Sequence, residues 1–98
     1  MIELDGDDEV MYLSGSRQGK GLHQSWKKFW THHTEDTWPV WCQIDDCYNQ
    51  ATFGGHLLVR GYPGEFILPR CRDCYEESEW LRPKSTAIGV WAKVRIKY

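Results

Sequence analysis

Four cysteines in a chain of 98 residues constrain the fold more than any other feature of the sequence. They form two close pairs, Cys42 with Cys47 and Cys71 with Cys74. A domain this short is near the limit of what a hydrophobic core stabilises unaided, so a cross-link or a bound metal is expected to contribute. Two cysteine pairs separated by the length of a hairpin are typical of a tetrahedral zinc site. We therefore predict a structural zinc ion held by these four thiols.

The spacing inside the first pair leaves an alternative open. Four residues separate Cys42 from Cys47, whereas two separate Cys71 from Cys74, as in a standard zinc turn. The wider gap leaves open whether all four thiols bind one ion. A disulfide between Cys42 and Cys47 is the main competing hypothesis.

The distribution of charge and of apolar residues excludes a membrane-spanning chain. No apolar run approaches the roughly 18 residues that cross a bilayer. The first ten residues contain five acids and no Lys or Arg, the reverse of a secretory leader. We therefore expect a cytoplasmic protein, in which a reducing environment favours metal-bound cysteines over disulfides.

The formal net charge of −2 conceals an uneven pattern. Residues 1–9 form an acidic tip, which we expect to be a solvated, partly disordered end. Without the first ten residues the chain has 12 basic and 9 acidic residues. Charge alone therefore identifies no partner.

An amphipathic helix is predicted over residues 21–33. Its apolar stripe follows a helical period and consists of Leu22, Trp26, Phe29, Trp30 and His33. We expect these aromatic side chains to lie in the core.

A strand is predicted over residues 87–98, because apolar residues alternate there with cationic ones. Two interpretations of its cationic face stay open. The face can contact a nucleic acid through Trp91, Lys93, Arg95 and Lys97. Alternatively, the cations protect a solvated sheet edge from pairing with another chain.

The segment between the cysteine pairs predicts a β-hairpin. Two short apolar runs, 56–60 and 65–68, flank a Gly- and Pro-containing turn. Acidic residues follow the last cysteine, as at the start of a helix: Glu76, Glu77 and Glu79. The order of turn, hairpin, cysteine pair and helix predicts a treble-clef zinc core over residues 41–81. The fold class is then α+β in a single domain, 1–98.

The motifs in this core resemble a known family. Gly-Gly-His-Leu at 54–57 and Ile-Leu-Pro-Arg-Cys-Arg-Asp-Cys at 67–74 are similar to the HNH, or ββα-metal, nuclease module in its four-cysteine form. The resemblance covers roughly two fifths of the chain. It implies a small zinc-binding protein of a bacterial cell or a phage-infected host.

The resemblance assigns catalytic roles at three positions. In active members the histidine equivalent to His56 is the general base that activates water. The residue before it is an Asp that binds the catalytic divalent ion, and here it is Gly55. The residue after the last cysteine is His or Asn, and here it is Tyr75. Both expected ligands of a catalytic ion such as Mg²⁺ are therefore missing.

Two functions follow from these residues. The first is a non-catalytic HNH-like module that binds a protein or nucleic-acid partner, such as a phage or mobile-element accessory or inhibitor protein. The second is a metal-dependent nuclease with His56 as base. Its catalytic ion would take ligands from Asp73, Glu76, Glu77 or Glu79. His56 has two further interpretations, a structural histidine and a zinc ligand.

Overall fold

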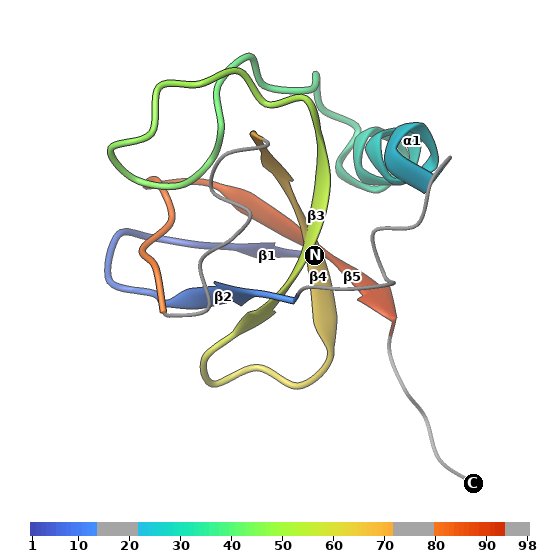
Figure 1. The fold of residues 1–98 in the computed structure, drawn as a ribbon. Coiled ribbons are helices and arrows are strands. Elements are labelled where there is room, and N and C mark those ends of the chain that lie inside the picture. The colour runs from blue at the N-terminus through green and yellow to red at the C-terminus, as the bar shows by residue number, and fades with distance from the viewer. Residues whose placement is uncertain (14–21, 72–79, 94–98) are drawn as a thin grey trace, which may run out of the picture.

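The computed structural model describes residues 1–13, 22–71 and 80–93. Within them it has one helix and a five-stranded antiparallel sheet (Figure 1), so the chain is an α+β protein. The elements are β1 (Ile2–Glu3), β2 (Val10–Tyr12), α1 (Leu22–Thr34), β3 (Phe53–Val59), β4 (Glu65–Arg70) and β5 (Ile88–Lys93).

The five strands follow the order β1-β5-β4-β3-β2. β1 and β2 therefore lie at opposite edges although only residues 4–9 join them, so the sheet must curl. Backbone hydrogen bonds extend both edges into the segment before β5. Val10 and Leu81 exchange two bonds of 2.8 and 2.7 Å, and Leu4 N donates to Ala87 O at 2.7 Å. The curled sheet encloses the larger part of the core.

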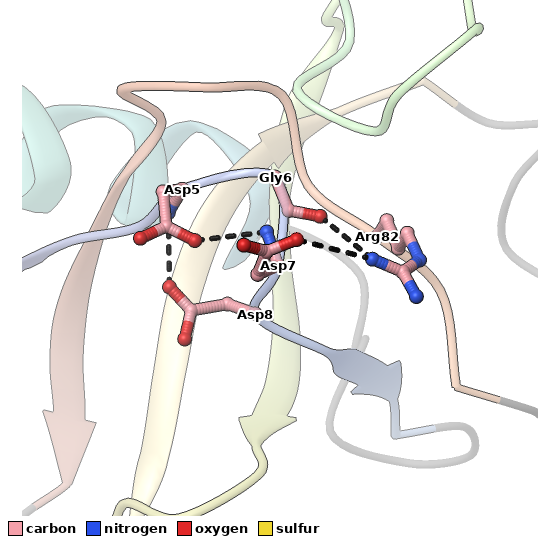
Figure 2. A network of polar contacts seen from close by, with 5 residues as sticks. All are labelled: Asp5, Gly6, Asp7, Asp8 and Arg82. Atoms are coloured by element: carbon pink, nitrogen blue, oxygen red, sulfur yellow. Dashed lines mark hydrogen bonds and ion pairs between the residues drawn. The ribbon is translucent and has the colours of Figure 1, made fainter.

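The acidic tip is solvated, as its composition predicts, but it is not a disordered end. Residues 2–3 form β1, paired with β5, and the side chain of Leu4 is only 1% exposed. The following turn is tied by its own carboxylates (Figure 2), because Asp5 N donates to Asp8 Oδ2 at 2.9 Å and Asp7 N to Asp5 Oδ1 at 2.8 Å. Carboxylates that cap their own backbone make a charged segment compatible with a tight turn. Its acids are therefore part of the β1–β2 connection.

The hairpin predicted between the cysteine pairs is formed by β3 and β4. Its strands are buried on both faces, since Phe66 and Leu68 point into the larger core while Ile67 points toward α1. The larger core has eleven buried members: Leu4, Val10, Tyr12, Cys42, Ile44, Leu57, Val59, Phe66, Leu68, Cys71 and Ala87. Three of the four cysteines thus belong to the face of the sheet opposite the helix or to its margin.

α1 covers the other face of the sheet with its aromatic stripe. Trp30 is 3% exposed, packs with Ile67 and Val90, and donates from Nε1 to Ile88 O at 2.8 Å. The close approach of α1 to β3 depends on Gly54, because a Cβ at this position would lie 3.2 Å from the Cβ of Trp26. Among the described residues, no helix has both the length and the apolar character that spanning a bilayer requires.

Candidate metal centre

Three thiols meet at one point beside the end of β4. The sulfur atoms of Cys42, Cys47 and Cys71 all lie within 4.8 Å of one another, and Cys47 Sγ is 3.6 Å from Cys71 Sγ. Zn–S bonds of about 2.3 Å in a tetrahedron place two sulfurs about 3.8 Å apart. A disulfide needs about 2.0 Å, and none joins these three cysteines. The arrangement can hold a metal ion.

Residues 41–50, which we call the knuckle, position the first two sulfurs. The knuckle folds back on itself through Cys42 N, which donates to Asn49 O at 2.9 Å. A tight turn at its tip has Cys47 N donating to Ile44 O at 3.1 Å, with Asp46 in the left-handed region at φ 63°. This turn lets a spacing of four residues bring both sulfurs to the same point.

The end of β4 supplies the third sulfur. Cys71 directly follows Arg70, the last residue of β4, and is 2% exposed. The knuckle is attached to this strand end because Gln43 N donates to Pro69 O at 3.1 Å. The position of Cys71 relative to Cys42 is therefore fixed by backbone hydrogen bonds as well as by packing.

Lys84 bridges two backbone carbonyls of the knuckle from a distant segment of the chain. Its ammonium donates to the carbonyl of Cys42 at 2.6 Å and to that of Cys47 at 2.8 Å. It approaches from the segment before β5, where Lys84 N also donates to Gln43 O at 2.8 Å. Sequence reasoning missed Lys84 because it lies 37 residues from Cys47 and belongs to no motif.

Asn49 is a second neighbour of the sulfurs that the sequence analysis did not identify. Its Nδ2 lies 3.7 Å from the sulfurs of both Cys47 and Cys71. An amide that donates to a thiolate stabilises its negative charge and orients it toward a metal. The only feature of the sequence that could have pointed to Asn49 is its position two residues after Cys47, a predicted ligand.

Burial controls the chemistry of Cys42. Removal from water raises the pKa of its thiol to about 11, while hydrogen bonds from the backbone N–H groups of Cys71 and Ile44 oppose that rise. The thiols of Cys71 and Cys47 also contribute to this raised pKa, though less than burial does, because like charges repel. A divalent cation is the kind of partner that stabilises a buried thiolate in such surroundings.

The fourth predicted ligand, Cys74, lies outside the described residues. So do Asp73, Tyr75, Glu76, Glu77 and Glu79 and with them most of the helix predicted after Cys74. At the end of that segment, Leu81 forms an isolated antiparallel bridge with Val10 rather than a helical turn. The described donor set is thus three sulfurs.

His56 does not join the thiols. It lies on β3 between Gly55 and Leu57, is 5% exposed, and turns toward α1, where its ring contacts Trp26 edge to face at 4.7 Å. The three-thiol cluster does not include it. The hypothesis that His56 is a zinc ligand is therefore wrong for the described cluster, because the alternation of β3 sends its side chain to the other face.

Gly55 has a packing role. A Cβ at this position would lie 2.1 Å from Arg70 Cδ and 3.2 Å from Tyr12 Cε1. The Arg70 side chain is fully buried, stacks over the Tyr12 ring at 3.9 Å and donates from Nε to Cys71 O at 2.7 Å. A cationic side chain therefore fills the space beside Gly55.

The cationic face predicted for the last strand is described only in part. Trp91 is half-buried, its ring lies 5.2 Å from that of Phe66, and its Nε1 donates to Pro63 O at 3.1 Å. It therefore packs on the sheet instead of standing free as a stacking platform. Lys93 ends β5, and Arg95 and Lys97 lie outside the described residues.

Comparison with known proteins identified no relative of this chain. No protein-family model, curated protein or solved structure matches the chain. The HNH resemblance stays a prediction that rests on the motif residues.

Proposed function

We propose that this protein is a small, non-catalytic binding module whose fold is stabilised by one zinc ion. Cys42, Cys47, Cys71 and Cys74 are the proposed ligands. The convergence of three described sulfurs within 4.8 Å carries the proposal. Thiolates select zinc among the abundant divalent ions, and four of them leave no open position for a reacting water. The ion would link the knuckle to the end of β4 and contribute to folding.

Two observations support a non-catalytic role. Arg70 fills the space beside Gly55, which leaves no room there for the carboxylate that a catalytic ion would need. His56 is 5% exposed beneath α1 and contacts Trp26, so water has little access to it as a general base. A fold resembling an HNH module that has lost its catalytic ion is the proposal these residues favour.

Binding a macromolecular partner is the proposed activity of the module. Large apolar side chains stand exposed on and next to the knuckle: Val40 at 59%, Trp41 at 50% and Tyr48 at 73%. Exposed large apolar side chains of this kind are typical of interaction sites. The partner we propose is a protein or a nucleic acid, as expected for an accessory protein of a phage or a mobile element.

Two measurements test this proposal. Circular dichroism before and after incubation with a strong chelator should show loss of structure, with recovery when zinc is restored. Plasmid and RNA incubated with the protein and Mg²⁺ or Mn²⁺ should stay intact. Cleavage by the purified protein that His56→Gln abolishes, with the variant still folded, would establish the nuclease instead.

A further inference from the structure

We propose that the surface between α1 and the knuckle binds a single-stranded nucleic acid, with a phosphate in a pocket and a base on Trp41. This inference rests on the proposed binding function and specifies its partner. The pocket has a volume of about 340 Å³ and is lined by Lys27, Lys28, Thr31 and Thr52.

The lining of the pocket is chemically suited to an anion. Lys27 and Lys28 are exposed, and they present two ammonium groups beside two threonines. The sequence of α1, residues 22–34, contains no Asp or Glu. Among the described residues that line the pocket, none carries a carboxylate that would compete for the lysines. Such a cluster of ammonium and hydroxyl groups attracts phosphate oxygens.

The aromatic residue that contacts Lys27 is held in place by the fold. Trp38 donates from Nε1 to Ala51 O at 2.9 Å, and its ring meets that of Trp30 edge to face at 5.4 Å. Lys27 Nζ lies 5.3 Å from the centre of the Trp38 ring, a cation–π distance that holds the ammonium near the pocket. A site fixed before binding loses less conformational entropy when a ligand enters.

The knuckle places an exposed aromatic ring next to this pocket. Trp41 pairs with Gln50 in an antiparallel bridge, and Ala51 N donates to Val40 O at 2.8 Å. Thr52 follows Gln50 by two residues, so this bridge brings the backbone of Trp41 toward a residue that lines the pocket. The Trp41 side chain is 50% exposed, so a base can stack on its ring.

The exposed ring of Trp41 favours a single strand over a duplex. A base can stack on Trp41 only if it is unpaired and free to leave its neighbours, which excludes an intact duplex. The negative charges of Asp45 and Asp46 are exposed at the tip of the knuckle and repel phosphates there. The backbone is therefore expected to follow α1 and to leave the surface before the knuckle tip.

The test is fluorescence anisotropy with a labelled oligothymidylate of about twelve nucleotides, a typical site size for one small domain. The variants are Lys27→Gln with Lys28→Gln, and Trp41→Ala. Matched controls remove an exposed cation and an exposed aromatic elsewhere, Arg82→Gln and Tyr62→Ala. Zinc content and circular dichroism are measured on every preparation.

The expected result is binding that weakens steeply with salt. Loss of two phosphate contacts should lower the slope of log K against log salt by about 1.4. Trp41→Ala should weaken binding at least about fivefold, and both controls should bind as the parent does. Absence of binding, equal losses in the controls, or equal affinity for a duplex of the same sequence would overturn the inference. If zinc and fold are intact in that case, the proposed zinc module stands and only this partner is excluded.

Discussion

The side chain of Arg70 occupies the space next to Gly55, so that a Cβ added at residue 55 would lie 2.1 Å from Arg70 Cδ. Arg70 cannot easily move aside, because it is fully buried, stacked on Tyr12 and bonded to Cys71 O at 2.7 Å. The pair links the glycine of the Gly-Gly-His motif to the end of β4, which is followed by Cys71. If Gly55 only replaces a catalytic Asp, Gly55→Asp should be tolerated. If Gly55 is needed for packing against Arg70, the same substitution should destabilise the fold.

Gly55→Ala should destabilise the protein by at least about 2 kcal/mol, since overpacking a core of this density forces strained side chains. Gly55→Asp should destabilise the protein more than Gly55→Ala does, and it should not create nuclease activity. Thermal or denaturant unfolding measures the effect. Gly6→Ala is the matched control, because nothing lies within 4 Å of a Cβ at that position. Equal stability of Gly55→Ala and Gly6→Ala would contradict the packing account.

Gly54→Ala should loosen the contact between α1 and the sheet. Its Cβ would lie 2.8 Å from Ile67 Cγ2 and 3.2 Å from Trp26 Cβ, and we expect a loss of about 1–3 kcal/mol in the free energy of unfolding. Gly89→Ala should be neutral or slightly stabilising, since its nearest neighbour, Phe66, is 3.6 Å away. The prediction fails if both variants unfold at the same denaturant concentration.

Lys84→Gln should weaken zinc binding without removing a ligand. The lysine donates to the carbonyls of Cys42 and Cys47, and loss of such supporting contacts typically reduces metal affinity about 10- to 100-fold. Competition with a chromogenic chelator measures the affinity. Lys28→Gln removes an exposed lysine from α1 and should leave zinc affinity unchanged. An unaltered affinity in Lys84→Gln would show that the knuckle holds its shape without this contact.

Zinc affinity should also decrease as the pH falls. Burial raises the pKa of Cys42 to about 11, so its thiol is protonated at neutral pH in the metal-free state and zinc must displace that proton. Each proton released makes binding about tenfold weaker per unit of pH lost, and acid therefore opposes binding. Chelator competition at about pH 8 and about pH 6 tests this expectation. A pH-independent affinity would mean that Cys42 is not a ligand.

The elements that the sequence predicts well are those specified by local pattern. The run from His56 to Leu68 around a Gly/Pro turn predicts the β3–β4 hairpin, and the cysteine pairs predict that Cys42, Cys47 and Cys71 come together. Both features need only alternation, turn chemistry or ligand spacing, which are visible over short stretches of chain.

The features that the sequence could not predict depend on contacts between distant segments. The acidic tip becomes ordered because Ile2 and Leu4 pair with residues near position 88, a partner that its own composition does not reveal. Trp91 lies on Phe66 because both faces of β5 are covered, whereas strand alternation alone implied one solvated face. Lys84 contacts the knuckle from 42 residues beyond Cys42, a separation that no local pattern reveals.

The most direct test of the central claim is the zinc content of the purified full-length protein, measured by elemental analysis against protein concentration. The account predicts one zinc ion per chain, retained through dialysis against metal-free buffer. Cys42→Ser and Cys71→Ser should each lose the ion, whereas Gly6→Ala should keep it. A content well below one ion per chain in protein that is nevertheless folded would contradict the account.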